Sequence, residues 1–427
     1  MRSTTATLLA LFVLLTGCAG GDEPAATDTG AGAGAEETTA PAETTAEGTA
    51  TGDATPTGDA TPTDGAPTGD GTETAAGDCT LDEPVKVGVV FSLTGGAAVF
   101  GATQANGVQL AADQLNAQGG VTYEIVQEDD GSDPAQGITA FEKLLNSDQV
   151  SAIIGPTLSN TAFSTDPIAQ EAGVPVLAVS NTAPGVTEMG EFVFRNSLAE
   201  SQVIPQTIAA AKEAFGLERV AVLYGSDDAF TEGGYTVFSE VLESEGIEVT
   251  TTQTFAKGDT DFAAQLTEAG NTEPDALVVS ALAEEGAQIL TQAAELGLDV
   301  PVIGGNGFNS PAIIENAGED AEGLIVGAAW NSASDNPRNA EFIPAYTEEF
   351  GAAPDQFAAQ AYAGMNLLDG AVRQACSAEP QAIRDALAGL SGVDTVLGEF
   401  SFQEDRDADH EAVVQVVENG EFAVLEQ

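Results

Sequence analysis

Two short polar segments of the chain carry side chains suited to binding a small anion. Residues 155–161 (GPTLSNT) follow the apolar run 152–154 and precede a helical pattern, and residues 180–184 (SNTAP) follow another apolar run. Hydroxyl groups beside the free backbone N–H groups at the start of a helix suit a carboxylate. Ser159 is therefore a candidate carboxylate ligand. The alternatives are that Ser159 or Asn160 only caps its own helix and that residues 180–184 form an ordinary turn.

Sequence motifs for catalysis, phosphate binding and dinucleotide binding are absent from residues 79–427. The single histidine, His410, and the three cysteines of the chain exclude His-rich metal sites and Cys-rich zinc modules. The acidic strings at 128–133 and 405–409 lack the spacing of a calcium loop, and we interpret them as helix caps and turns. We therefore expect a binding protein rather than an enzyme, with no metal and no cofactor.

The chain is strongly acidic. It has 11 Lys and Arg residues against 68 Asp and Glu residues in 427, a formal net charge of −57 at pH 7. Such a polyanion has no basic patch that could release the counterions of nucleic acid or of an anionic membrane surface, so neither is expected as a partner. Apolar residues make up 43% of the chain, which is enough for the cores of two or three domains.

The elements that must position these residues follow a repeating order of strand and helix. Apolar, β-branched runs alternate with amphipathic stretches, and parallel strands need such helix-length connections. Continuous apolar strands must also be covered on both faces. The fold class is therefore α/β, with two doubly wound parallel-sheet lobes. The first lobe takes strands at 85–91, 123–126, 152–154 and 174–178 and helices at 103–117, 135–145 and 162–171.

The same order restarts after residue 195. Further helices toward the C-terminus must dock on one of the two sheets, and short strands end the chain. The second lobe takes strands at 220–224, 248–255, 276–279, 302–303 and 324–327 and helices at 204–215, 235–245, 262–269, 286–296 and 311–316. Helices at 340–350, 356–376 and 380–388 and strands near 400–402, 413–417 and 422–425 follow.

Ligands of doubly wound sheets bind beyond the carboxyl ends of the strands. The segments 155–161 and 180–184 lie at such ends, and so does the Gly-rich segment 92–101, which contains Phe100. Taken alone, a phenylalanine is more often part of the core than of a ligand site.

The N-terminal region has the features of a bacterial lipoprotein leader. A short apolar run precedes Leu15-Thr16-Gly17-Cys18, which resembles a lipobox, in which the cysteine is acylated and becomes the new N-terminus. A signal peptide at 1–18 with an incidental cysteine is the alternative. Residues 19–78 are made of Ala, Gly, Thr, Pro, Asp and Glu, so we expect a disordered acidic linker. This composition also fits a glycosylated stalk.

Two cysteines remain once Cys18 is assigned to the lipid. Thiols of exported proteins are usually oxidised, so Cys79 and Cys376 are a candidate disulfide. Two unpaired buried thiols are the alternative, because pairing needs a Cα separation that the sequence does not give.

Several short motifs occur in an order that is typical of one family. They include Val87-Gly88, Ser92-Leu93-Thr94-Gly95, Gly155-Pro156 with Ser159, Phe194-Arg195, Asp227-Asp228 with Phe230, Gly304, and Leu397-Gly398 with Phe400. Each motif alone is weak, but the ordered set spans residues 85–417. It resembles the type I periplasmic solute-binding proteins of ABC importers, in the leucine/isoleucine/valine-binding (branched-chain amino acid) branch.

The resemblance implies two lobes that are joined by a three-crossing hinge and close around a ligand in the cleft. The domain at 79–427 would then divide at crossings near 195–199, 327–330 and 396–400. The first lobe would comprise about 80–197 plus 331–395, and the second about 198–330 plus 396–427.

The resemblance also implies roles for particular residues. The loops that contain Ser159 and Thr182 would take the ligand carboxylate, with Asn181 contributing its backbone. Phe100 and Phe230 would form aromatic walls.

One departure from the family's pattern concerns a ligand ammonium group. The branched-chain amino acid binders pair it with an acid where this chain has Asn306. A neutral amide lacks the charge that a desolvated ammonium requires. Glu284 or Glu285 could substitute. Otherwise the ligand would be an amide, a urea-like compound or a carboxylate without an amine.

These expectations combine into one function. The protein would be an extracytoplasmic substrate-binding lipoprotein of an ABC importer, which binds a branched-chain or other amino acid and delivers it to the permease subunits. It would be a monomer on the outer face of the cell membrane, held there only through the lipid on Cys18. The alternative is a ligand-sensing receptor module built on the same lobes.

Overall fold

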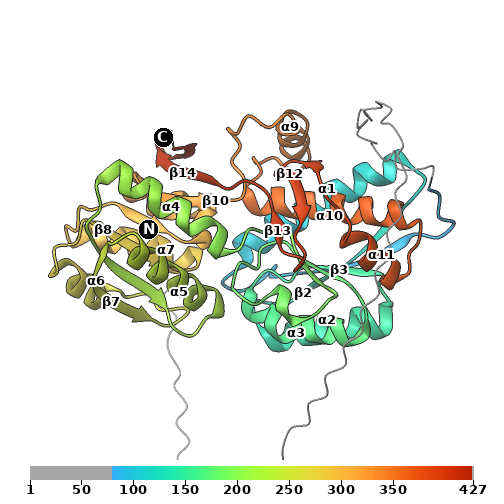
Figure 1. The fold of residues 1–427 in the computed structure, drawn as a ribbon, viewed down its shortest axis with the longest axis horizontal. Coiled ribbons are helices and arrows are strands. Elements are labelled where there is room, and N and C mark those ends of the chain that lie inside the picture. Colours follow the sequence, from blue (N-terminus) through green and yellow to red (C-terminus); the bar gives the residue numbers. More distant parts are fainter. Residues whose placement is uncertain (1–78, 426–427) are drawn as a thin grey trace, which may run out of the picture. The chain divides into compact units, whose positions relative to one another are not determined.

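The computed structural model describes residues 79–425, which lie within one compact unit. The expected signal peptide at 1–18, with Cys18, and the expected linker at 19–78 lie outside the described residues. Figure 1 shows the α/β fold of the described part, with strands in the interior and helices around them. Between residues 79 and 425, no helix is both long and apolar enough to cross a membrane.

The first sheet is parallel throughout and has the strand order β2-β1-β3-β4-β5. Helices cover both of its faces, with α1 on one face and α2 and α3 on the other, which explains the continuous apolar sequence of β1 (VKVGVVF). The elements are β1 Val85–Phe91, α1 Ala98–Gln118, β2 Tyr123–Asp129, α2 Pro134–Lys143, β3 Ala152–Ile154, α3 Ser159–Ala172, β4 Val176–Ala178 and β5 Val193–Arg195, with short helical turns at Leu144–Asp148 and Thr187–Met189.

The second sheet has the order β15-β14-β10-β9-β8-β6-β7. Strands β6 to β10 are parallel to one another. Strands β14 and β15 extend the sheet at the β10 side in antiparallel pairing. The elements are α4 Glu200–Phe215, β6 Arg219–Gly225, α5 Ala229–Ser244, β7 Glu248–Phe255, α6 Ala263–Gly270, β8 Ala276–Ser280, α7 Ala283–Glu295, β9 Val302–Gly304, α8 Pro311–Ala317, β10 Ile325–Ala328, β14 Val413–Glu418 and β15 Glu421–Val424, with short turns at Asn306–Asn309 and Gly318–Ala321.

The chain returns to the first sheet between β10 and β14. Helix α10 packs against α1, and its apolar side chains join the core of β1. The small sheet β11-β12-β13 belongs to the same core, through Phe400 and Phe402. The chain therefore passes to the second sheet only between β13 and β14, later than the expected crossing at 396–400. The returning elements are α9 Asn339–Phe350, α10 Gln356–Ala375, α11 Pro380–Leu387, β11 Val393–Thr395, β12 Gly398–Phe402 and β13 Ala408–Asp409.

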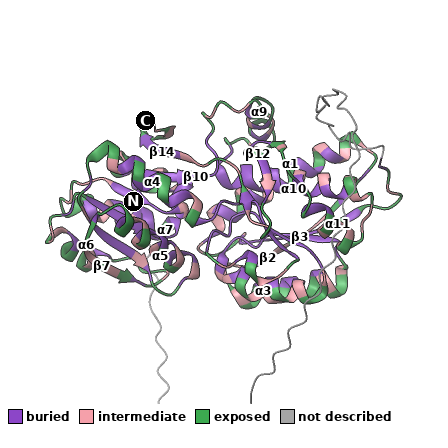
Figure 2. Cartoon of the chain, in the orientation of Figure 1, coloured by how far each residue is buried: buried purple, intermediate pink, exposed green. Residues whose placement is uncertain are grey.

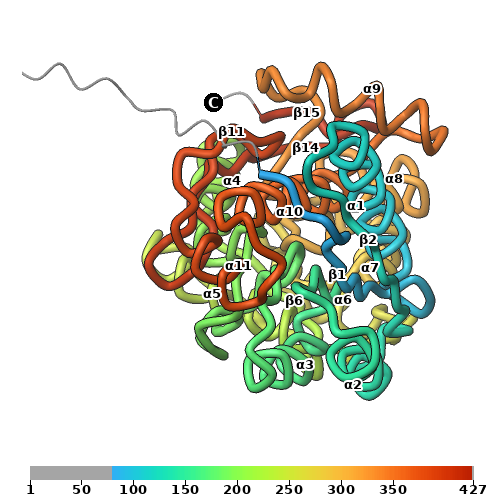
Figure 3. The backbone as a smooth tube through the Cα atoms, turned by 90° about the vertical axis from the view of Figure 1, so that its right-hand side faces the viewer, coloured from blue at the N-terminus to red at the C-terminus, as the bar shows by residue number. Residues whose placement is uncertain are grey.

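A disulfide joins the start of the described chain to the end of α10. Cys79 and Cys376 are bonded, with their Cα atoms 5.5 Å apart, so the alternative of two unpaired thiols does not apply. Figure 3 shows α10 beside the blue segment that leads into β1. Figure 2 shows the buried strands in purple and the exposed outer faces of the helices in green, as expected for sheets covered by helices.

Candidate ligand-binding site

One pocket lies where the carboxyl ends of strands from both sheets meet the start of α10. Its lining comes from α1 and α10, from the segments after β3 and β4 of the first sheet, and from those after β6, β8 and β9 of the second. Doubly wound sheets bind their ligands at this position. The pocket is lined by Phe100, Thr157, Leu158, Ser159, Ser180, Phe230, Leu282, Asn306, Gly307 and Phe357.

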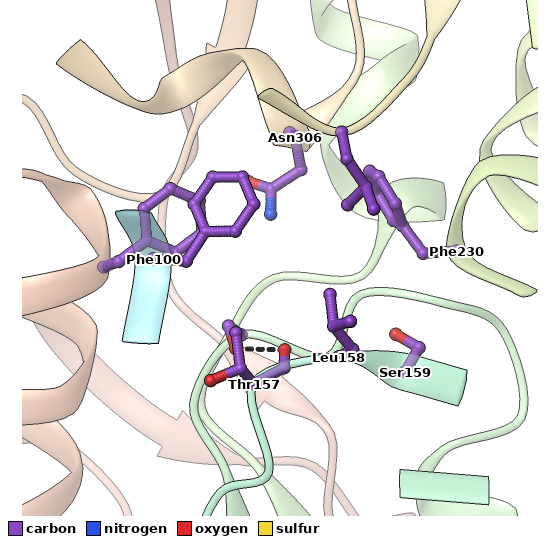
Figure 4. A pocket seen from close by; sticks show the side chains of 10 residues that line it. Phe100, Thr157, Leu158, Ser159, Phe230 and Asn306 are labelled. Atoms are coloured by element: carbon purple, nitrogen blue, oxygen red, sulfur yellow. Dashed lines mark hydrogen bonds between the residues drawn. The ribbon is translucent and has the colours of Figure 1, made fainter. Parts of the chain in front are cut away.

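Four residues that the sequence suggested surround this pocket: Phe100, Ser159, Phe230 and Asn306. Figure 4 shows Leu158 and Ser159 along one side, with Phe100, Asn306 and Phe230 facing them. The walls are mainly apolar, and the few polar groups lie at the strand ends. This distribution suits a small solute with an apolar body and a polar end.

Ser159 is the first residue of α3. The N-cap residue is Leu158, and no side chain caps the helix, so the alternative that Ser159 or Asn160 caps its own helix is wrong. The first backbone N–H groups of α3 have no partner within the helix, as at any helix start. Together with the buried hydroxyl of Ser159, they form an arrangement that favours a carboxylate.

Asn160 reaches from α3 to the start of α5 on the second sheet. Its Nδ2 donates to Asp228 Oδ2 at 2.8 Å, and its Oδ1 accepts from the Ala229 N–H at 2.8 Å. Asp228 also caps α5. These bonds connect elements of the two sheets at the rim of the pocket.

Sequence analysis missed a buried network behind Thr157 and Ser180. Thr157 Oγ1 donates to Gln104 Oε1, Gln104 Nε2 donates to Ser180 Oγ, and Ser180 Oγ donates to the Thr157 carbonyl, each at 2.7 Å. The network holds the loops after β3 and β4 together. Ser180 stands in a segment that the sequence marked as polar, but nothing in the sequence marked Gln104, which lies in the middle of α1.

Asn181 and Thr182 do not line the pocket. Asn181 is buried, its Nδ2 donates to the Thr157 carbonyl at 3.3 Å, and its own carbonyl accepts from Arg195 at 3.2 Å. The Thr182 hydroxyl donates to Glu200 Oε1 at 3.2 Å. Both residues thus lie just behind the pocket wall.

The acids at 284 and 285 do not reach the pocket. Glu284 lies in the first turn of α7, beside a separate surface depression. Glu285 is buried and accepts from the Gly258 N–H at 2.8 Å. Neither residue compensates for the amide at Asn306 in this conformation.

Asn306 presents hydrogen-bond donors to the pocket. Gln356 Oε1 accepts from the Ala329 N–H at 2.6 Å, which leaves Gln356 Nε2 to donate to Asn306 Oδ1 at 2.8 Å. The Asn306 amide nitrogen is therefore free to face the pocket, as Figure 4 shows. A donor at this point suits a ligand oxygen.

Glu200 is a second residue that sequence analysis missed. It is the first residue of α4, is 2% exposed, and accepts from Thr182 and, at 3.4 Å, from the Asn306 N–H. Burial raises the pKa of its carboxyl to about 7, while these hydrogen bonds and the charge of Arg195 offset part of the effect. An acid at the start of a helix is common, so no signal in the sequence distinguishes Glu200.

The pocket is nearly filled by its own walls. Its volume is about 20 Å³, room for about one water molecule. The rings of Phe100 and Phe357 pack with their centroids 4.6 Å apart. A solute the size of an amino acid requires the walls to move apart, and the segments that would move belong to different sheets.

Comparison with known proteins gives one consistent family. Residues 84–421 match the family described as "Periplasmic binding protein". The chain is 28% identical to the Leu/Ile/Val-binding protein BraC3 of Rhizobium johnstonii over 328 residues, which cover 76% of this chain and 88% of that protein.

Solved structures agree with this family. The chain is similar to the branched-chain amino acid transporter substrate-binding protein LivJ from Streptococcus pneumoniae in complex with isoleucine (28% identity, TM-score 0.76, 80% of this chain and 99% of that one). It is also similar to an ABC transporter solute-binding protein from Rhodopseudomonas palustris BisB5 in complex with 3,4-dihydroxybenzoic acid (26% identity, TM-score 0.72, 79% of this chain and 95% of that one).

The family match covers nearly all of the described residues, and both sheets take part in it. The relatives are solute-binding proteins rather than enzymes, which agrees with the lack of catalytic motifs. From its sequence and its fold, the chain belongs to the periplasmic binding protein family.

Proposed function

We propose that this protein is an extracytoplasmic substrate-binding lipoprotein of an ABC importer, which binds an amino acid through its carboxylate and delivers it to a permease. The observation that carries the proposal is the pocket itself. Strand ends of both sheets converge there on the first turn of α3 and the hydroxyl of Ser159, between apolar walls. The carboxylate would lie at α3, and the apolar body between Phe100 and Phe230.

Closure of two lobes around the solute would produce the transport signal. In this proposal the elements on the first sheet form one lobe, about 80–197 plus 331–409, and those on the second form the other, about 198–330 plus 413–425. The contacts of Asn160 with the start of α5 join the lobes in the closed form. A permease that binds only the closed form responds to solute because the solute shifts the population toward it.

Attachment to the membrane is the second part of the proposal. Cys18 would carry the lipid after removal of the leader, and the acidic segment 19–78 would tether the folded part to it. The folded part then works as a monomer close to its permease.

A carboxylate without an amine is the second candidate ligand. It is favoured by the neutral Asn306 in the pocket lining. The similar protein from Rhodopseudomonas palustris was solved in complex with 3,4-dihydroxybenzoic acid, which supports this candidate.

Ligand binding to the wild-type protein and to Ser159→Ala tests the proposal. A thermal-shift screen of amino acids, amides and organic acids identifies ligands, because a bound ligand raises the apparent stability. Calorimetry then compares the variants. Loss of the Ser159 hydroxyl is expected to weaken binding about tenfold, and removal of the ligand carboxylate should abolish it. Ser164→Ala, which changes a hydroxyl further along α3, should bind as the wild type does. Equal affinity of Ser159→Ala and the wild type would contradict the proposed site.

A further inference from the structure

A buried carboxylate without a cationic partner lies directly behind the pocket. Glu200 Oε1 accepts from the Thr182 hydroxyl and from the backbone of Asn306, at 3.2 and 3.4 Å. These donors come from the loops after β4 and β9, one from each sheet. Asn306 itself lines the pocket, so the carboxylate is one hydrogen bond away from the lining.

Arg195 is the cation whose charge acts on Glu200, but its donors are used elsewhere. Its Nε and one terminal nitrogen pair with the carboxylate of Asp407, and its other terminal nitrogen donates to the carbonyls of Asn181 and Ala183. Glu200 therefore makes no ion pair with the described residues. A buried, ionised carboxylate without an ion pair costs free energy unless a positive charge comes close to it or it binds a proton.

A hydroxyl without a partner lies beside this carboxylate. Ser280, at the end of β8, is 1% exposed, and its Oγ has no hydrogen-bond partner among the described residues. A Cβ atom placed on Gly234 would lie 2.5 Å from Ser280 Oγ and 4.0 Å from Glu200 Cδ. The lack of a side chain at Gly234 thus lets the backbone of α5 approach both polar groups closely, so that they lie against the same glycine.

We propose that Glu200 and Ser280 form the subsite for the ligand's ammonium group and make the protein selective for amine-bearing carboxylates. The inference rests on the proposed function of the pocket. When the walls separate to admit a solute, its ammonium would pass the edge of Asn306 and donate to Glu200 and to Ser280 Oγ. An ammonium group offers three donors and one positive charge, which matches an unpaired acid beside an unpaired acceptor.

This assignment decides between the two candidate ligand classes. A neutral amide at 306 by itself favours an amine-free acid, but Glu200 supplies the missing charge from a different element. Amino acids are then expected to bind more tightly than the same compounds without the amine, for example leucine more tightly than 4-methylpentanoate.

The test compares amino acids with their amine-free counterparts on the full-length protein. Affinities are measured by calorimetry for the wild type, for Glu200→Gln and for Glu213→Gln, which removes an exposed charge from the same helix. Glu200→Gln should weaken binding of the amine-bearing ligand tenfold or more and change that of its amine-free counterpart less than twofold. Glu213→Gln should leave both affinities unchanged.

Ser280→Ala provides a second variant that should fold normally, because the hydroxyl it removes has no hydrogen-bond partner among the described residues. It should weaken the binding of amine-bearing ligands about threefold and leave the affinity for amine-free acids unchanged. If the wild type binds carboxylates but prefers the amine-free acids, this inference is wrong, and the pocket binds the second candidate ligand of the proposed function. If Glu200→Gln weakens binding of both classes equally, this inference is wrong while the proposed function stands. If the wild type binds neither class, both fail.

Discussion

At the scale of the residue, burial controls the protonation of Glu200. Its pKa is about 7, well above the ordinary value of 4.5, because burial disfavours the charged form. Between these two pH values the folded protein holds a proton that the unfolded chain has lost. The free energy of unfolding of the ligand-free protein should therefore fall as the pH rises from about 4.5 to about 7. Glu200 alone accounts for a decrease of about 3 kcal/mol in the free energy of unfolding over this pH range.

Denaturant unfolding at pH 5 and pH 8 measures this effect as a difference between variants. Other buried acids, such as Asp166 and Asp355, have pKa values raised by burial and act in the same direction, so the wild-type slope alone is not diagnostic. Glu200→Gln should lose less stability than the wild type between the two pH values, whereas Glu213→Gln should match the wild type. Identical pH dependence in all three proteins would show that Glu200 does not titrate in this range.

The sequence could suggest site residues only where a local pattern exposes them. Ser159 and Asn306 lie in polar segments directly after apolar strands, and the topology brings such segments together. Glu200 and Ser280 have no such mark, because their importance depends on burial and on missing partners. Glu284 looked suitable by its position in the chain, but the first turn of α7 places it beside a different surface.

At the scale of the element, the close contact of α1 with α10 positions the aromatic wall of the pocket. A Cβ atom on Gly107 of α1 would lie 2.3 Å from the Ala358 carbonyl at the start of α10. Gly107→Ala should therefore destabilise the protein by about 1–3 kcal/mol and displace Phe357, which lines the pocket. Gly370→Ala on α10, where nothing lies within 4 Å, should be neutral or stabilising by up to about 1 kcal/mol.

Thermal unfolding of the two glycine variants measures this difference directly. If Gly107→Ala were as stable as Gly370→Ala, the helices would have room to separate, and the contact would not position the pocket wall.

Most elements could be predicted because their periodicity is strong. The exceptions have physical reasons. Helix α1 begins at Ala98 rather than near 103, because Gly101 does not break the helix but lets it approach Ser92, whose carbonyl would be 2.0 Å from a Cβ atom there. Strand β5 was missed because its three residues are too short for a periodic signal.

At the scale of the whole molecule, the repeated order of strands and helices predicted the division into two sheets. It did not predict where the chain crosses between the lobes for the third time. The second lobe was expected to resume at about residue 396, with the crossing at 396–400. Residues 398–402 instead pair within the small sheet whose Phe400 joins the first core. An isolated short strand gives no information on which of two apolar cores it covers. Contacts between the sheets are equally invisible in the sequence, because they join residues far apart in the chain.

Asn160 provides a test of closure that does not depend on contact with the ligand. Its side chain bonds Asp228 and Ala229 across the two sheets, and these bonds exist only when the sheets are close. Asn160→Ala should therefore raise the apparent Kd about tenfold by lowering the population of the closed form, and solution scattering should show a larger radius at the same ligand concentration. The melting temperature of the ligand-free protein should change little if its open form predominates. Asn366→Ala, which removes an amide bonded only within α10, should leave affinity and scattering unchanged. If Asn160→Ala lowers the ligand-free melting temperature but keeps the wild-type affinity, these bonds stabilise the fold and do not control closure.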